Sequence, residues 1–565
     1  MLMISRFAAL ARSSQAVAAL GFLVLTASAF SQFGVSPSQT SNYFDDFRAR
    51  SSRMQQSGAG VRSGDVVYDY DSGTYIGVEG QEQMRPEDLL RESRQVSQPA
   101  VNSGSAAFSA RAVGDYTNYS GQYTSPTGYF APTYTSDPFL AGKRNVKLGP
   151  VNVGFGLYQG FEYNSNINRS TNNPVSDIIS TTMLNIDANY RISKNNVLSM
   201  STGIGFDHYF SHPELSPYGN GNAVLNVLPG STIAFDMKAG PLYFTVYDRV
   251  SVRPAVNNAF TLNGQSVFGV FTNDFGVVMN YALNSKWSLS LGVNNSMSMA
   301  MENRFSQFDR TINSIQGTIT YSPHGTWSTG FEFSHSRLEY DQQLLNDGSM
   351  KNLGVFFRTN LGKSTYLKVA GGYQNFEFDN PILLAPPAVV DFNTDMEDYY
   401  FNLSISNQLN NRFSHALSLG HESALNLTSN FVTASYINYG ISMITSRGGR
   451  LSLSSYFEDA TPSAIYLPPS PFASQGEVRQ HGFDVYYSHQ ITSKIRMGTG
   501  YHYGRTDAKA PGNDFDQHAF NVDFNMALTA KSNINFGYRY FTTDTVGIAQ
   551  DFNQHRLILG FNYNF

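Results

Sequence analysis

The 565-residue sequence predicts an all-β protein, a transmembrane antiparallel β-barrel of about 20 strands (18–22), preceded by a signal peptide and a polar, mostly disordered N-terminal segment. Three observations predict this class. Apolar and polar residues alternate with a period of two from about residue 148 to the end, short and long connections alternate between these runs, and only 14% of the residues are charged. Soluble globular chains carry about 25% charged residues, so the low fraction favours an exterior that lies in lipid.

The rest of the composition agrees with a membrane sheet. Aromatic residues reach 14%, nearly all of them Phe and Tyr, and there is no cysteine, which excludes disulfides and thiolate metal sites. Few charges together with many aromatics is not the balance of a disordered chain. The net charge of −5 is small for this length and argues against nucleic acid as a partner.

Residues 1–29 are predicted to be a signal peptide. Arg6 and Arg12 precede the apolar run "AVAALGFLVLTASAF", no acidic residue interrupts them, and Ala27 and Ala29 have the spacing of a cleavage site. The alternative is a membrane anchor, which would need about 20 apolar residues. This run is shorter and turns polar at once, so export with cleavage is favoured.

Residues 30–147 are predicted to form a polar, low-complexity periplasmic segment. The segment is rich in Ser, Gly, Gln and Tyr and has no sustained period. Within it, "GDVVYDYDSGTYIGVEG" is compatible with one short hairpin, and "RPEDLLRESRQ" with a short helix that has proline in its first turn. A flexible spacer is the favoured interpretation; a periplasmic contact segment, or a piece that folds into a pore, is the alternative.

Residues 148–565 are predicted to form the barrel. In "LNIDANYRI" the residues Leu184 and Ile186 alternate with Asn185 and Asp187, and "NVGFGLYQGFEYN", "LSMSTGIGF" and "FNLSIS" alternate in the same way. A side-chain period of two is that of a strand. No segment here has a convincing 3.6-residue period.

The connections indicate how the strands are arranged. Very short ones rich in Gly, Asn and Ser recur along the region, which is hairpin chemistry: "SKNN", "KAGP", "NSK", "SPHGT", "GKS", "NNR", "SRGGR", "TSK" and "AKS". Between consecutive members lies a second kind of connection, usually longer and more variable. Turns that are short at one end and long at the other are typical of a transmembrane barrel. A soluble β-sandwich or propeller would show no such difference and would carry more charge outside.

Two sets of aromatic residues are predicted to mark the periplasmic side. Trp287 and Trp327 fall just after short turns, where a periplasmic aromatic girdle would lie. The chain ends on "LILGFNYNF", in which Phe561, Tyr563 and Phe565 are expected to face lipid, as are the preceding leucines, while the asparagines face water. An even strand count returns both termini to the periplasm.

Several stretches resemble the β-barrel porin 2 family of Gram-negative outer-membrane proteins. They are "FEYNSNINRS", "NYRISKNNVLSMSTGIGFDHYFSHPEL", "GGYQNFEFD" and "ISNQLNNRFSHALSLGHESALNL", and the resemblance spans most of 151–565. It implies location in the cell outer membrane and no catalytic residues, and it allows a role in exopolysaccharide export. The terminal Phe561, Tyr563 and Phe565 also resemble the assembly signal that the barrel-insertion machinery reads.

Candidate residues for chemistry are few. "DFDQH" (514–518) and "DFNQH" (551–555) combine carboxylates with imidazole, which could hold a metal. Because they recur at the same place in two hairpins, we interpret them as solvated strand starts on the extracellular rim. His208, His212 and His335 are scattered, and no phosphate loop or nucleophile elbow occurs. We therefore expect no enzyme, no metal and no cofactor.

The expected function is a porin-like passive channel for small polar solutes, with outer-membrane lipid and the insertion machinery as partners. The strand faces opposite the apolar ones favour Asn, Ser, Gly and Thr, which predicts a wet, weakly charged wall. Two apolar, proline-rich loops, 381–390 and 464–472, either narrow the pore or dock a partner, or else pack together as a lid. The alternatives are a non-enzymatic component of an exopolysaccharide export or assembly system, and a TonB-dependent-like receptor with about 22 strands and a plug.

Overall fold

The computed structural model describes residues 67–69, 74–76 and 146–565, the last range with gaps at 169, 194, 216–222, 257–266, 304–305, 307–308, 324–325, 343–346, 363, 380–394, 411, 426–430, 447–448, 463–476, 509–512 and 548–550. The predicted signal peptide, most of the segment 30–147 and the loops 381–390 and 464–472 lie outside the described residues. No helix among the described residues is long and apolar enough to cross a membrane.

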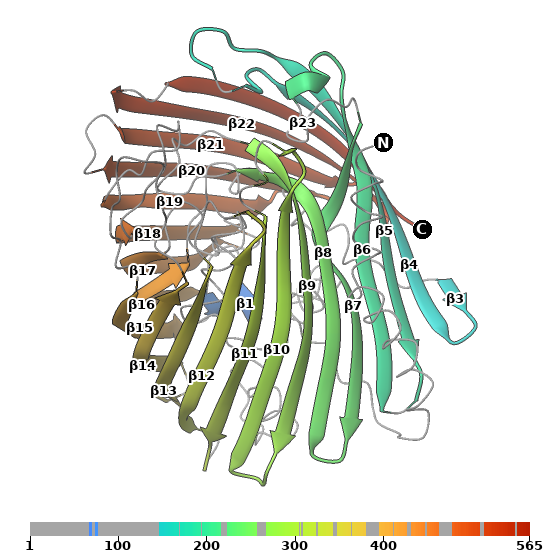
Figure 1. Ribbon diagram of the computed structural model, residues 1–565. Helices are drawn as coiled ribbons and strands as arrows, with labels where there is room; N and C mark the ends of the chain where they lie inside the picture. Colours follow the sequence, from blue (N-terminus) through green and yellow to red (C-terminus); the bar gives the residue numbers. More distant parts are fainter. Residues whose placement is uncertain are drawn as a thin grey trace.

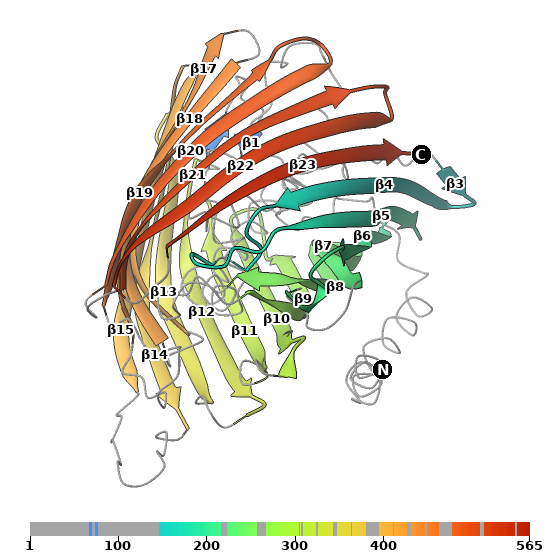
Figure 2. The same cartoon turned by 90° about the horizontal axis from the view of Figure 1, so that it is seen from above.

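Twenty consecutive strands, β4 to β23, form a closed antiparallel barrel in which each strand pairs with the next and β23 pairs with β4 (Figures 1 and 2). The prediction of an all-β barrel of about 20 strands is confirmed. The strands are β4 (Val151–Asn164), β5 (Asp177–Arg191), β6 (Asn196–Tyr209), β7 (Ala223–Ala239), β8 (Leu242–Val256), β9 (Val267–Ala282), β10 (Trp287–Ala300), β11 (Arg310–Tyr321), β12 (Trp327–Tyr340), β13 (Gly348–Asn360), β14 (Thr365–Phe378), β15 (Met396–Asn410), β16 (Phe413–Leu425), β17 (Phe431–Ser446), β18 (Gly449–Pro462), β19 (Val478–Gln490), β20 (Ile495–Ala508), β21 (Asn513–Ala527), β22 (Ser532–Gly547) and β23 (Phe552–Asn564).

Three further strands and one short helix complete the described elements. β3 (Val146–Leu148) pairs with the start of β4, and β1 (Val67–Asp69) pairs with β2 (Thr74–Ile76) as a small antiparallel hairpin. The hairpin lies in the stretch that the sequence marked as compatible with one. The 3₁₀-helix η1 (Pro213–Leu215) lies in the connection between β6 and β7.

The connections differ between the two ends of the barrel as predicted. At one end nine connections of two to five residues join the strands, and all nine predicted short turns fall there. One of them places Gly240 at a φ of 58°, the left-handed conformation that glycine adopts without strain, directly before Pro241. At the other end the connections run from four to 17 residues. β4 begins and β23 ends at the short-turn end, so the first and the last residues of the barrel lie at the same rim.

Each strand has one apolar face that points outward. On β12 the outward residues Phe331 and Phe333 are 61% and 38% exposed, while the alternate residues Glu332, Ser334 and Ser336 are buried on the inner side. The same alternation holds along β13 and β23. Because the two faces of a strand differ by one residue step, this pattern fixes which face of each strand lies on the outside of the barrel.

The barrel closes where β23 meets β4. The register runs from Arg556 opposite Asn164 to Asn564 opposite Gly156, and the backbone N–H of Phe565 donates to the carbonyl of Phe155 over 3.0 Å. On the inner side the Arg556 guanidinium donates two hydrogen bonds of 2.6 Å to the carboxylate of Glu162. Both side chains are more than four-fifths buried. A bidentate pair with this burial stabilises the closing contact between the first and last strands of the barrel.

We expect Arg556→Ala to lower the free energy of unfolding by roughly 3 kcal/mol, because it leaves Glu162 buried without its partner. The measurement is urea unfolding of the reconstituted barrel followed by the fluorescence of its two tryptophans. Arg479→Ala is the matched control, since Arg479 forms a largely exposed ion pair with Asp459 and its loss should cost less than about 1 kcal/mol. Equal losses in the two variants would contradict the closing role of Arg556.

Candidate functional site

Aromatic side chains cluster on the outer face at the short-turn end. Trp287 and Trp327 are the first residues of β10 and β12. Tyr321 lies between them, with ring centroids 4.7 Å from Trp287 and 5.9 Å from Trp327, and Phe357 continues the row at 6.1 Å from Trp327. Amphipathic rings in such a row favour the boundary between lipid and water. The position agrees with the predicted girdle; its role in a membrane stays a prediction.

The apolar part of the outer face forms a band that can be followed along β12. On β12 the outward row runs from Trp327 through Phe331 to His335, eight residue steps or about 26 Å along the strand. A strand tilt of about 40° reduces this to roughly 20 Å, close to the ~25 Å apolar band of outer-membrane barrels. Beyond it the outward residues become charged: Arg337 pairs with Asp379, and Lys351 pairs with Glu377 at 2.7 Å.

The last strand has the faces that the sequence predicted. Leu557, Leu559 and Phe561 are exposed on the outer face, and Phe565 is 48% exposed, whereas Asn562 is buried on the inner side. Tyr563 packs edge-on against Phe565 with ring centroids 4.9 Å apart. The assignment of Phe561, Tyr563 and Phe565 as an assembly signal remains a prediction.

The two "D-F-x-Q-H" motifs lie at the long-loop end, at the starts of β21 and β23. In the first, Asp516 accepts a hydrogen bond from Tyr503, and His518 bonds the Tyr501 hydroxyl at 2.9 Å. In the second, His555 bonds the hydroxyl of Tyr538 at 3.0 Å. The histidines are therefore held by tyrosines of the neighbouring strand on the outer face.

The remaining histidines named from the sequence lie apart. His208 packs edge-on against Phe210, His335 lies on the outer face of β12, and His212 bonds Glu214 at 3.0 Å in the loop after β6. A hydrogen bond from its own backbone and the bond to His212 lower the pKa of Glu214. Within the described ranges no group of three or more His, Asp or Glu side chains is arranged to hold a metal ion.

Several charged groups on the inner wall are paired with opposite charges. Besides Arg556 and Glu162, the ion pairs are Arg249–Asp274 at 3.6 Å and Arg539–Asp523 at 3.7 Å. Other inward carboxylates bond uncharged side chains: Glu332 accepts from the Tyr400 hydroxyl over 2.7 Å, and Asp207 accepts from Thr181 and Asn226. Opposite charges in contact cancel much of each other's field, so these ion pairs add little net charge to the wall.

The inner wall is not uniformly polar, and the expectation that it would be is wrong for β11 to β17. Near the long-loop end the inward side chains form an apolar cluster, here called the mouth patch. Its centre is Ile312, Leu338, Met350 and Phe376, each at most 2% exposed. Tyr340, Phe378, Met396 and Phe431 pack against these four. At this end the alternation reverses, as in "NFEF" (375–378), where the phenylalanines point inward and Glu377 points outward, so a period-of-two pattern does not reveal this patch.

One pair of neighbouring strands is only partly joined. The ladder between β15 and β16 ends at Phe401 opposite His421, although β15 begins at Met396 and β16 continues to Leu425. Over the same stretch β15 remains paired with β14, and β16 remains paired with β17. The wall therefore has a gap in its backbone hydrogen bonding at the long-loop end, here called the seam.

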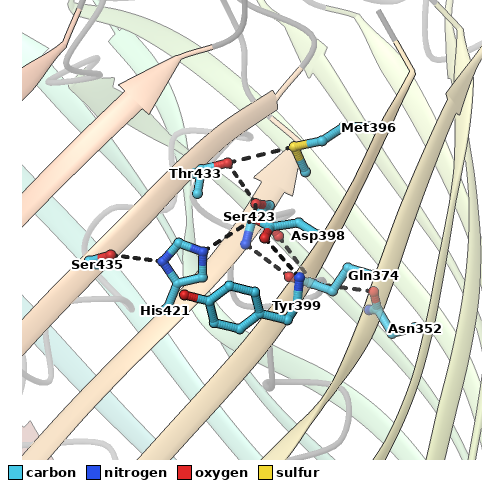
Figure 3. A network of polar contacts seen from close by, with 9 residues as sticks. All are labelled: Asn352, Gln374, Met396, Asp398, Tyr399, His421, Ser423, Thr433 and Ser435. Carbon is cyan, nitrogen blue, oxygen red and sulfur yellow. Dashed lines mark hydrogen bonds and ion pairs between the residues drawn. The ribbon is translucent and has the colours of Figure 1, made fainter.

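Side chains replace the missing ladder at the seam (Figure 3). The Gln374 amide, from the inner face of β14, accepts a 3.0 Å hydrogen bond from the backbone N–H of Ser423 and donates one of 3.3 Å to its carbonyl. Gln374 also donates to Asn352 over 3.2 Å, and Asn352 in turn donates to Ser334. One primary amide thus satisfies both backbone groups that β15 leaves without a partner.

On the outer half of the seam His421 lies between a serine and an aspartate. Its Nδ1 is 2.8 Å from the Ser435 hydroxyl and its Nε2 is 3.2 Å from Asp398, while Tyr399 stacks on its ring at 4.6 Å. Asp398 also accepts a 3.0 Å hydrogen bond from the hydroxyl of Ser423 (Figure 3). His421, Ser435 and Tyr399 lie on the outer face, whereas Asp398 lies opposite Gln374 on the inner face of β15, so the hydrogen bond between His421 and Asp398 passes through the seam. No local motif links these residues, so nothing in the sequence points to the group.

We expect Gln374→Leu to loosen the seam, because it removes both hydrogen bonds to the Ser423 backbone inside the wall. Burying those groups unsatisfied costs about 1–3 kcal/mol, which corresponds to a roughly tenfold or greater rise in local opening. Hydrogen exchange at the Ser423 amide measures this rise. Gln316→Leu is the control, since Gln316 is also inward-facing but lies where the ladder is complete. Equal exchange in Gln374→Leu and the parent would refute the role of Gln374.

Comparisons with known proteins identify no family. No protein-family model matches the chain, and no curated protein matches it. Among solved structures the FrpB iron transporter from Neisseria meningitidis (F5-1 variant) aligns at 9% identity and a TM-score of 0.47, covering 73% of this chain and 82% of that one. The siderophore receptor PirA from Pseudomonas aeruginosa aligns at 9% and 0.45, covering 73% and 80%. OmpT of Vibrio cholerae aligns at 10% and 0.32, covering 74% and 99%. These likenesses support no conclusion about function.

Proposed function

We propose that the chain is a porin-like passive channel for small polar solutes in the outer membrane of a Gram-negative cell. The observation that carries this proposal is the closed twenty-strand barrel with an apolar outer face and paired charges on its inner wall. Lipid offers no hydrogen-bond partner to an open sheet edge, so strands cross a bilayer only as a closed barrel. Barrels of 16–18 strands already enclose an aqueous channel.

The proposed orientation places the short-turn end of the barrel in the periplasm, together with the start of β4 and the end of β23. Short periplasmic turns and longer extracellular loops are usual for this class. Trp287 and Trp327 would then form the periplasmic girdle, and the loops of up to 17 residues would face the outside. The predicted signal peptide agrees with export across the inner membrane.

The proposed mechanism is diffusion without a reaction. Inward charges that neutralise one another, as Arg556 and Glu162 do, give a wall with weak preference for either sign of ion. Uncharged polar solutes fit such a wall best. Because transport by diffusion needs no chemical step, we propose that the protein is not an enzyme and uses no cofactor.

The sequence leaves two alternatives to the channel function. The resemblance to the β-barrel porin 2 family allows a non-enzymatic role in exopolysaccharide export or assembly, with polysaccharide as the partner. A TonB-dependent-like receptor would use about 22 strands around a plugged lumen. The twenty strands of this barrel favour the channel over that receptor.

We expect purified protein in planar bilayers to give stepwise conductance with weak discrimination between cations and anions. The physical reason is the paired inner-wall charge. Swelling of liposomes in a panel of neutral sugars, with charged sugars of the same size as the comparison, would rank the solutes. No conductance at any voltage, together with no swelling, would refute the channel proposal.

We expect deletion of Phe565 to lower the amount of protein inserted into the outer membrane several-fold, because it removes the terminal aromatic of the proposed assembly signal. Fractionated membranes and heat-dependent gel mobility measure inserted, folded barrel. Phe565→Tyr is the matched control and should insert normally, since it keeps an aromatic ring at the last position. Normal insertion of the deletion variant would show that the terminal ring is not read.

A further inference from the structure

The mouth patch is an unusual surface for the inside of a water-filled barrel. Met350 and Phe376 are fully covered, and Ile312 and Leu338 nearly so, although all four project to the inner side of the wall. Exposing an apolar patch of this kind to water is costly at roughly 25 cal/mol per Å². In the structure the patch is covered, and two of the side chains packed on it, Met396 and Phe431, come from β15 and β17.

The hairpin β1–β2 lies beside this patch. β2 contacts β15, β16 and β17, three successive strands of the wall. β15 and β17 contribute Met396 and Phe431 to the patch. In both views the hairpin lies within the outline of the barrel (Figures 1 and 2). β2 thus lies against the two strands that supply Met396 and Phe431 to the mouth patch.

The same strands carry the seam. β15 and β16 separate beyond Phe401 and His421, and this stretch is held by Gln374 and Asp398 instead of a ladder. β2 contacts both strands that border the seam, and one of them, β15, also supplies Met396 to the mouth patch.

We propose that the hairpin β1–β2 docks on the inner wall at the mouth patch and narrows the lumen of the barrel. This inference rests on the proposed channel function. The occupant is the chain's own N-terminal hairpin, because β2 is the element that contacts this wall. The 69 residues between Ile76 and Val146 are enough to join the hairpin to the start of the barrel, since each residue of an extended chain spans about 3.3 Å. Displacing the hairpin would widen the channel.

Cross-linking in the full chain tests the docking itself. The protein has no cysteine, so Tyr75→Cys can be combined with Ala434→Cys on β17, or with Ala519→Cys on β21 as the control. Both alanines are completely buried and lie near the long-loop end of their strands. We expect oxidation to link β2 to β17 and not to β21. Equal linkage to both positions, or linkage to neither, would overturn the docking.

Conductance tests whether the docked hairpin narrows the pore. We expect deletion of 67–76 to raise single-channel conductance or open probability several-fold, whereas deletion of the equally long 101–110 should leave both unchanged. Equal conductance in the two deletions and the parent would overturn the narrowing but leave the proposed channel function intact. If none of the three conducts, the channel function fails, and the cross-link alone then decides whether the hairpin docks.

Discussion

The requirement that every backbone N–H and C=O find a partner without water governs this structure. A sheet meets it only by closing on itself, and in this barrel Arg556 and the last backbone groups of β23 bond Glu162 and Phe155 of β4. The outer face is mainly apolar. Most polar pairing lies on the inner wall or at the two rims, with exceptions such as the bonds of Gln159 to Thr182 and Ser180 on the outer face.

The seam shows how strictly this requirement is met. Where β15 and β16 separate, Gln374 takes over the hydrogen bonds of Ser423, and Asp398 gathers His421 and the Ser423 hydroxyl. The arrangement of Ser435, His421 and Asp398 resembles that of hydrolases in its connectivity, yet here it joins three strands at a gap. The same side-chain types that perform catalysis in hydrolases here connect neighbouring strands of the barrel wall.

Much of the fold is predictable from the sequence because lipid imposes a simple code. The period of two predicted the strands, and the residues Gly, Asn and Ser predicted all nine short turns, including that of Gly240. The mouth patch was not predictable, because the alternation reverses near the long-loop end: Phe376 and Phe378 point inward while Glu377 between them points outward. The seam was not predictable either, because Gln374, Asp398 and Ser423 lie far apart in the chain and meet only where a ladder ends.

The gap between β15 and β16 also affects the loop that precedes β15. The backbone of Met396 to Tyr400 is paired with β14 alone and is tied to β16 only through the side chain of Asp398, so a change in the length or twist of residues 379–395 can shift this arm with little effect on the ladder of β16. From Phe401 and His421 toward the short turn, β15 and β16 are paired, and this pairing holds the two strands together. Changes in the sequence of this loop therefore have little effect on the strand register of the twenty-strand wall. The long-loop end can vary in sequence while the paired part of the barrel stays the same.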